Sequence, residues 1–383
     1  MVTGADYRRL VETCRDEGYA LPAVNVVGTD SINAVLEAAA RNRADVIIQL
    51  SNGGARFYAG EGMEDAARAR VLGAVAAARH VHTVAAAYGV CVILHTDHAD
   101  RKLLPWISGL IDASEEAVKE TGQPLFSSHM IDLSAEPLED NIAECAAFLR
   151  RMAPLGIGLE IELGVTGGEE DGIGHDLDDG ADNAHLYTQP EDVLKAYEAL
   201  SPLGFVTIAA SFGNVHGVRA GQCQAAARDP AQLAGGRGRG HGQGDKPLAL
   251  VFHGGSGSEQ AKITEAVSYG VFKMNIDTDI QFAFASSVGR YVHEHAEAFS
   301  HQIAPSTGKP TKKLYDPRKW LRVGRWASWS GWNVPLPIWV PPGAPLRAWS
   351  EQVTGVRGKR QRVGRRTSPR NYRTGAYAGL CLE

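Results

Sequence analysis

The sequence predicts an α/β protein, and more specifically a closed (β/α)8 barrel, with eight parallel strands surrounded by helices. Three observations favour this fold: eight short apolar stretches, helical sequences between them, and polar or glycine-rich segments where most stretches end. A doubly wound open sheet is the alternative, but no GxGxxG motif follows the first apolar stretch. The 383 residues are enough for one such barrel with additions.

The predicted strands are apolar runs that suit strands buried on both faces of a parallel sheet. The third, within 91–100 (CVILHTDHAD), is the clearest, because its apolar residues are followed at once by His95, Thr96, Asp97 and His98. The other strands are predicted at 20–28, 45–51, 124–132, 157–164, 205–213, 248–253 and 270–275. In a barrel, the carboxyl ends of all these strands would meet at one mouth.

The predicted helices are segments in which apolar residues recur at helical spacing. Ile32, Val35 and Leu36 show this spacing in the second helix, for which Asp30 or Ser31 would be the N-cap. The other helical segments are predicted at 11–18, 66–87, 112–121, 138–152 and 189–200. This alternation of strands and helices favours parallel strand pairing.

Three histidines lie at or just beyond the predicted ends of the third, sixth and seventh strands: His98, His216 and His253. Three neutral imidazoles with one open position are typical of a catalytic zinc site. The three histidines have no local ligand spacing, and any one of them alone would be explained as a polar residue near a strand end. Their equivalent positions favour a metal site.

The segment 253–258 (HGGSGS) predicts an anion site. Gly254 and Gly255 would let backbone N–H groups approach a phosphate, and Ser256 would add a hydroxyl donor. The loops after strands seven and eight of a barrel commonly bind phosphate. An ordinary flexible turn is the alternative for this segment, and a helix cap is the alternative for the polar 275–279 (NIDTD) beside it.

Several carboxylates could take part in the chemistry. Glu169 and Glu170 lie in a glycine-flanked loop, where they could supply a base or form a solvated acidic turn. Asp97 could act as an acid and base or orient a histidine. Asp132 and Glu162 could hold a second cation or be structural. Together with a Lewis acid and a phosphate site, these groups suit carbon–carbon bond chemistry.

The composition is that of a soluble globular protein, with 44% hydrophobic and 22% charged residues. No stretch is long and apolar enough for a membrane span, and residues 1–10 lack the apolar core of a secretory signal. The five cysteines are scattered without CxxC pairs, so we expect a reduced, cytoplasmic protein. Residues 325–383 carry ten Lys/Arg and two Glu, a charge of +8. The net charge of −5 therefore leaves −13 on residues 1–324, which argues against nucleic-acid binding.

A series of motifs resembles one known family, the class II, zinc-dependent fructose-bisphosphate aldolases, and their longer-chain subgroup in particular. These motifs are PAVNVVGTDSINAVLE, QLSNGGA, LHTDHA, LFSSHMIDLS, LEIELGVTGGEEDG, LYTQPEDV, TIAASFGNVHGV, VFHGGSGS and KMNIDTD. The resemblance extends over 22–218 and 248–322. It implies a TIM barrel and the reversible cleavage of fructose 1,6-bisphosphate into dihydroxyacetone phosphate and glyceraldehyde 3-phosphate, a reaction of glycolysis and gluconeogenesis.

The resemblance also implies a role for particular residues. His98, His216 and His253 would bind the catalytic zinc, Glu170 would take the proton of dihydroxyacetone phosphate, and Asp97 would exchange the proton at the aldehyde end. Asn275 would steady the enediolate oxygen. The dihydroxyacetone phosphate half would be held by Gly217, Gly254, Gly255, Ser256, Ile276, Asp277 and Thr278, and the glyceraldehyde phosphate side by Ser51 and Asn25. Asp132 and Glu162 match a second metal position, and a monovalent cation (K⁺ or Na⁺) near the phosphate is a family trait. Arg318 would reach the site of a neighbouring subunit in a homodimer.

Two segments depart from the family pattern, 219–246 and everything beyond Gly324. The segment 219–246 has glycines and arginines but little apolar periodicity. The segment beyond Gly324 is unusual in its tryptophans, since six of the seven in the chain lie between Trp320 and Trp349. We therefore expect a barrel domain over 1–324 with an atypical insert at 219–246, and an irregular basic tail over 325–383. One hypothesis is that both segments are read in a shifted frame; the alternative is a divergent basic tail that binds RNA or a membrane.

Two alternative functions remain for the whole protein: a tagatose-bisphosphate aldolase, and an inactive binding or structural relative.

Overall fold

The computed structural model describes the backbone of residues 1–164, 167–170, 173–175, 188–210, 215–216, 248–254 and 260–330. Side chains are described for 1–164, 188–210, 248–254 and 263–325. The atypical insert at 219–246 and residues 331–383 of the tail lie outside these ranges.

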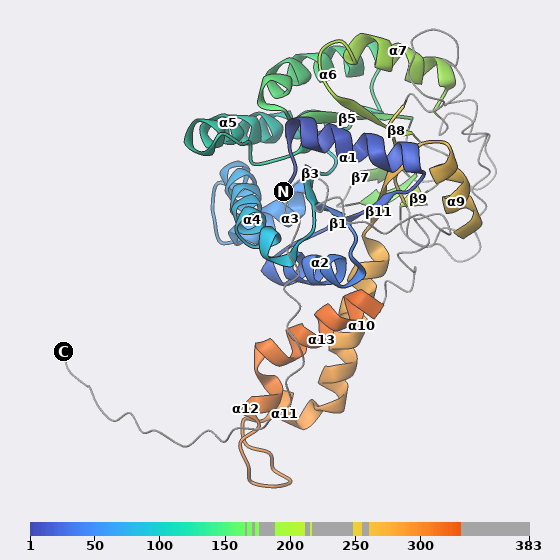
Figure 1. Ribbon diagram of the computed structural model, residues 1–383. Coiled ribbons are helices and arrows are strands. Elements are labelled where there is room, and N and C mark those ends of the chain that lie inside the picture. The colour runs from blue at the N-terminus through green and yellow to red at the C-terminus, as the bar shows by residue number, and fades with distance from the viewer. Residues whose placement is uncertain are drawn as a thin grey trace, which may run out of the picture.

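Eight parallel strands form a closed barrel, which confirms the predicted fold class (Figure 1). The strands are β1 (Leu21–Asn25), β2 (Val46–Leu50), β3 (Val92–Thr96), β4 (Ser128–Ile131), β5 (Gly158–Leu163), β8 (Val206–Ala210), β10 (Leu250–Phe252) and β11 (Val271–Ile276). Their order around the barrel is β1-β11-β10-β8-β5-β4-β3-β2. Each lies within one of the eight predicted strand segments or passes its end by a single residue.

A small separate sheet consists of β6 (Gly167–Glu170), β7 (Ile173–His175) and β9 (Val215–His216). β6 pairs antiparallel with β7 and parallel with β9, where Gly168 is opposite His216. This pairing brings together the backbones of two segments in which the sequence predicted site residues.

All six predicted helices are present around the barrel, but two of them begin earlier than predicted, one has a different N-cap, and the structure contains further helices that the sequence did not predict. The helices around the barrel are α1 (Gly4–Glu17), α2 (Thr29–Asn42), α3 (Asn52–Ala59), α4 (Ala66–Tyr88), η1 (Arg101–Leu103), α5 (Leu104–Thr121), α6 (Leu138–Met152), η2 (Ala153–Leu155), α7 (Pro190–Leu200) and α9 (Gln260–Ser268). Helices α1 and α5 begin earlier than predicted, because their first turns already bury apolar residues such as Tyr7 and Trp106. Helices α3 and α9 and the short helices η1 and η2 were not predicted. The hydroxyl of Ser51 caps α3 by accepting the Gly54 N–H. The N-cap of α2 is Gly28 rather than Asp30 or Ser31, and Ser31 Oγ accepts the Gly28 N–H.

The interior of the barrel changes from apolar to polar along its axis. Side chains alternate between the two faces of a strand, so Ile93 and His95 of β3 both face inward while Leu94 packs under the helices. At the amino end, the inward side chains form an apolar cluster that α1 closes with Leu10 and Val11. Toward the carboxyl end the buried side chains are polar: Gln49, His95, Glu160 and Lys273. This polar layer lies beneath the mouth where the chemistry was predicted.

Four helices form an arm that projects from the barrel: α10 (Thr278–Glu294), α11 (Ala296–Ser300), α12 (Lys312–Tyr315) and α13 (Pro317–Ser330) (Figure 1). Helix α13 returns along α10 and is tied to α2 of the barrel by Arg322 with Glu37 at 2.5 Å and by Arg325 with Asp30. Residues 325–330 are therefore helical, which corrects the prediction that an irregular segment begins at Arg325. The apolar and ionic contacts of α13 with α10 and α2 stabilise this helix despite its unusual composition.

Among the described residues, the structure contains no helix that is both long and apolar enough to cross a bilayer.

Candidate active site

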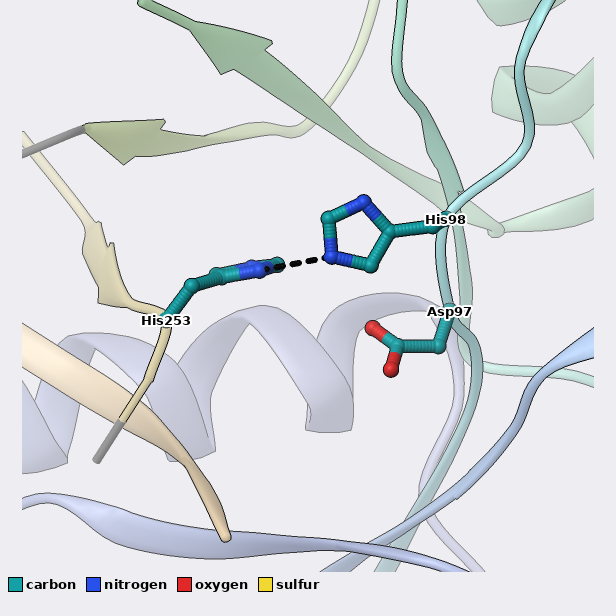
Figure 2. A group of neighbouring side chains, drawn as sticks. All are labelled: Asp97, His98 and His253. Carbon is teal, nitrogen blue, oxygen red and sulfur yellow. Dashed lines mark hydrogen bonds between the residues drawn. The ribbon is translucent and has the colours of Figure 1, made fainter. Parts of the chain in front are cut away.

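Two imidazoles face one another at the carboxyl end of the barrel (Figure 2). His98 follows β3 and His253 follows β10, and the distance from His98 Nε2 to His253 Nδ1 is 2.9 Å. The rings are nearly perpendicular, at 88°, with centroids 4.7 Å apart. His98 has a φ of 26°, which is rare for a residue with a side chain, so the backbone after β3 is strained at this position.

The outer ring nitrogen, on the far side of each imidazole, contacts a carboxylate, which is partly buried in Asp132 and buried in Glu160. His98 Nδ1 lies 2.8 Å from Asp132 Oδ2, and His253 Nε2 lies 3.0 Å from Glu160 Oε1. Because an ionised carboxylate only accepts hydrogen bonds, each outer nitrogen carries a proton and the two inner nitrogens are directed at each other. Two facing lone pairs repel unless a cation or a proton lies between them.

This donor set fits a divalent metal. The inner nitrogens of His98 and His253 and a carboxylate oxygen of Asp97 all lie within 4.8 Å of one another. Imidazole nitrogens backed by carboxylates are the usual surroundings of a protein-bound metal ion. Without an ion, the raised pKa of His98 allows a proton to take this place. Burial lowers that pKa, but Glu162, Asp132 and Asp97 together raise it well above its usual value.

A second group consists of His98, Asp132 and Glu162, whose ligand atoms also lie within 4.8 Å of one another. His98 Nδ1 is 3.4 Å from Glu162 Oε2, and Asp132 accepts hydrogen bonds from the backbone N–H and hydroxyl of Ser134. The structure therefore brings together the two carboxylates for which a second metal position was predicted.

Asp97 is 1% exposed and is surrounded by amide donors. Asn25 Nδ2 and Gln49 Nε2 each donate to Oδ2 at 3.0 Å, and Asn275 Nδ2 donates to Oδ1 at 3.3 Å. Burial raises the pKa of Asp97, but His98, Lys273, His253 and the Asn25 hydrogen bond outweigh burial and lower it. Asp97 is therefore an ionised carboxylate beside the two imidazoles.

Other predicted residues lie around this centre. Ser51 caps α3 after β2, and Gly254 follows His253 with a φ of 66°, the left-handed conformation that favours glycine. Ile276 ends β11, Asp277 accepts hydrogen bonds from Gln281, and Thr278 begins α10. These residues come from the ends of β2, β10 and β11, as the barrel prediction required.

Some predicted residues cannot be placed by their side chains. Glu170 lies in β6 and His216 in β9, but the side chains of both residues are outside the described part of the chain. Gly217, Gly255 and Ser256 also lie outside it. Arg318 is described, but it lies in the first turn of α13 on the arm, its side chain is 89% exposed, and it pairs with Asp316. The structure does not bring Arg318 to the mouth of its own barrel.

Three polar residues that lie at the site were not predicted from the sequence, namely Gln49, Glu160 and Lys273. Each is at most 2% exposed and lies inside a barrel strand. The available signal was a polar or charged residue in the middle of an apolar run, as in VIIQL, GLEIEL and VFKMNI.

Comparisons with known proteins agree with this geometry. A sequence model of the family described as "Fructose-bisphosphate aldolase class-II" matches residues 5–328. A fructose-bisphosphate aldolase of Campylobacter jejuni is 53% identical in an alignment of 338 residues, and the match covers 85% of this chain and 91% of that protein. The class 2 fructose-bisphosphate aldolase of Escherichia coli K12 is 50% identical over 339 residues, with 85% and 91% of the two chains covered.

A solved structure is similar as well. The crystal structure of fructose-bisphosphate aldolase from Campylobacter jejuni has a TM-score of 0.76 and 49% sequence identity, and the match covers 88% of this chain and 95% of that one. The facing histidines at the barrel mouth, the family match over most of the chain and relatives that share about half of its residues lead to one conclusion. This protein belongs to the class II fructose-bisphosphate aldolase family.

Proposed function

We propose that this chain catalyses the reversible, zinc-dependent cleavage of fructose 1,6-bisphosphate into dihydroxyacetone phosphate and glyceraldehyde 3-phosphate. The single observation that carries the proposal is the pair of imidazole nitrogens of His98 and His253, 2.9 Å apart and beside the buried Asp97. Family membership and the names of the relatives give the substrate class.

His98, His253 and His216 would hold the zinc ion. A bound zinc ion supplies a Lewis acid that draws electrons from the ketone oxygen of the substrate. Asp132 and Glu162 would hold a second cation, and the family resemblance adds a monovalent cation, K⁺ or Na⁺, near the phosphate.

The proton transfers belong to residues of this chain. Asp97 is an ionised base held by Asn25 and Asn275, so it can take the proton of the hydroxyl group as the carbon–carbon bond breaks and return it in synthesis. Glu170 would exchange the carbon-bound proton of dihydroxyacetone phosphate. Asn275 reaches both Asp97 and His253, and this position lets it orient the substrate oxygen between them.

The phosphate groups would be held at the ends of the strands. Gly254 begins the glycine-rich segment after β10, and Asp277 and Thr278 lie at the start of α10 after β11. With Gly217, Gly255, Ser256 and Ile276, they would bind the dihydroxyacetone phosphate half. Ser51 and Asn25 would contact the glyceraldehyde phosphate side.

We also propose that the protein is a cytoplasmic homodimer in which Arg318 acts in the site of the neighbouring subunit. The arm carries Arg318 away from its own barrel and exposes large apolar side chains, among them Phe299, Ile303 and Leu314. Three cysteines of the described part of the chain, Cys14, Cys91 and Cys145, are free and buried, which suits a reducing compartment.

The test is to measure cleavage of fructose 1,6-bisphosphate and tagatose 1,6-bisphosphate by the purified protein, before and after dialysis against a chelator. We expect fructose 1,6-bisphosphate to be the better substrate, activity to disappear with the metal, and zinc to restore it. Cleavage that resists the chelator would exclude the zinc mechanism. Absence of turnover by folded, zinc-loaded protein would favour an inactive relative.

A further inference from the structure

The side of His253 that faces away from His98 contacts a buried ion pair. Lys273 Nζ lies 2.8 Å and 2.9 Å from the two oxygens of Glu160, and Glu160 Oε1 lies 3.0 Å from His253 Nε2. Glu160 comes from β5 and Lys273 from β11, so the contact spans the inside of the barrel. Glu160, Lys273 and His253 are each at most 2% exposed.

We propose that Glu160 and Lys273 are positioning residues, which together fix His253 in one ring orientation and one tautomer with Nδ1 directed at His98. The proposal rests on the proposed function in one respect, namely that His98 and His253 hold a metal. Nothing in the family comparisons assigns a role to either residue.

The geometry explains why two residues are needed. A carboxylate in this polar layer could turn toward several donors, and the two contacts from Lys273 hold both of its oxygens in place. Oε1 then accepts the hydrogen bond from Nε2–H of His253 in a fixed geometry. Nδ1 is therefore the unprotonated ring nitrogen, with its lone pair in the ring plane. The lysine also cancels the carboxylate charge, so the hydrogen bond is made without adding a net charge under the metal site.

Folding stability is a weak explanation for this pair. Replacing a buried ion pair by apolar residues of similar volume is often neutral or stabilising, because the desolvation of two charges offsets their attraction. A pair that contributes little to stability but touches a metal-binding residue is better explained by its effect on that residue.

His95 also faces this carboxylate. Its Nε2 is 3.5 Å from Glu160 Oε2, and its Nδ1 contacts Ser128 Oγ at 2.8 Å. His95 is therefore close to Oε2 of Glu160, whereas His253 contacts Oε1. Ser128, which contacts His95, provides a control position in the same buried layer.

The central experiment compares two double variants, Glu160→Leu/Lys273→Met and Glu160→Gln/Lys273→Met. Both lack the ion pair, but only glutamine retains an oxygen that can accept the His253 N–H. Zinc affinity is measured by competition of the metal-free proteins with a colorimetric chelator, and thermal unfolding of the same metal-free proteins is recorded. We expect the leucine double variant to bind zinc about 10- to 100-fold more weakly at unchanged or higher stability, and the glutamine double variant to recover most of the affinity.

The control variant Ser128→Ala removes a buried hydroxyl from the same layer without touching His253, and we expect it to bind zinc as the unchanged protein does. If the leucine double variant is folded and also binds zinc like the unchanged protein, the inference is wrong. His253→Ala separates this outcome from failure of the proposed function. Zinc binding that does not depend on His253 would overturn the metal site itself, whereas binding that depends on His253 but not on Glu160 would overturn only the positioning role.

A second measurement needs no variant in the ion pair. In the metal-free protein labelled with ¹⁵N-histidine, the signals of His253, assigned with a His253→Asn variant, report which ring nitrogen carries the proton. We expect a protonated Nε2 and an unprotonated Nδ1. A proton on Nδ1 in place of Nε2 would contradict the proposal even if the double variants did not fold.

Discussion

At the scale of single residues, Asp97 combines burial with a lowered pKa. Three side-chain amides and two imidazoles surround a carboxylate that is 1% exposed. Such a group remains ionised at neutral pH and can accept a proton only when the substrate brings one close. Its position beside His98 makes it the natural acid and base of the site.

We predict that Asp97→Asn lowers kcat for cleavage by about 10²- to 10⁴-fold, because the amide cannot accept the proton. Zinc content should stay close to that of the unchanged protein, because the proposed zinc ligands are histidines, whereas thermal unfolding should occur at a lower temperature, because the asparagine NH2 would face a side-chain amide donor. The control is Asp100→Asn, three residues on, where the side chain only caps η1. A variant at position 97 with unchanged kcat would remove Asp97 from the proposed mechanism.

His129 predicts an acid-dependent loss of stability. Burial lowers the pKa of this histidine to about 3, while its Nδ1 contacts Thr96 Oγ1 at 2.8 Å. In the unfolded chain the pKa is about 6.5, so the unfolded state binds the proton first as the pH falls. The contribution of His129 to stability is thus complete above about pH 6.5 and is lost progressively toward pH 3, by up to about 1.4 kcal/mol per pH unit.

The variant His129→Asn keeps a polar atom near Thr96 but cannot titrate. We expect its free energy of unfolding, measured with urea between pH 7 and 4, to fall with pH less steeply than that of the unchanged protein. Equal slopes for the two proteins would contradict the burial of a neutral imidazole.

The sequence was sufficient to place His98, His253 and Asp97 at the barrel mouth, because polar residues that follow apolar strands lie at that end of the barrel. It was not sufficient for Gln49, Glu160 and Lys273, which lie inside the strands. A single polar residue in an apolar run does not reveal whether it faces the helices or the barrel interior until the register is known. The pairing of β2 with β3 in register, Ile47 opposite Ile93 and Gln49 opposite His95, is what places Gln49 inside.

At the scale of elements, the close packing of α3 on α4 depends on Gly73. A Cβ atom at this position would lie 1.7 Å from the carbonyl oxygen of Ala55, which belongs to the backbone and cannot turn away. This contact fixes α3, whose N-cap is Ser51, a residue of the proposed substrate site. The packing of two helices is thereby connected to the site.

We predict that Gly73→Ala lowers the free energy of unfolding by about 1–3 kcal/mol, because one helix must move away from the other. The same displacement of α3 should raise KM more than it lowers kcat. The matched variant is Gly289→Ala in α10, where an added Cβ meets no atom within 4 Å. In that helix interior, alanine should raise stability by about 0.5–1 kcal/mol, so the two substitutions should differ in sign when measured by urea unfolding.

Element prediction succeeded where the hydrophobic period was regular and failed at ends decided by tertiary contacts. Helix α6 was predicted with the bounds that the structure has, Leu138–Met152. Helix α5 begins eight residues before the predicted start at 112, because Pro105 is favourable in a first turn and Trp106 and Ile107 are buried there. Helix α13 extends past Arg325, since its contacts with α10 and α2 are not visible in local composition.

At the scale of the whole molecule, the closed barrel brings together residues that are distant in the sequence. His98 and His253 are 155 positions apart and yet are in contact, because β3 and β10 deliver their carboxyl ends to one mouth. Arg318 is the exception, since the arm holds it away from that mouth. If Arg318 takes part in catalysis, the complete site includes two chains.

This arrangement predicts complementation between two inactive variants. Asp97→Asn lacks the proposed base, and Arg318→Ala lacks the residue that would act in the neighbouring subunit. In a mixed dimer, the subunit with Arg318→Ala keeps its own Asp97 and receives Arg318 from its partner, so one complete site forms. The isolated mixed dimer should show about half of the unchanged activity, because one of its two sites is complete. The variants are co-expressed with two different tags, and the mixed dimer is isolated by sequential affinity steps before cleavage is measured. An inactive mixed dimer would indicate that Arg318 serves its own subunit or none, and failure to isolate any mixed dimer would contradict the homodimer itself.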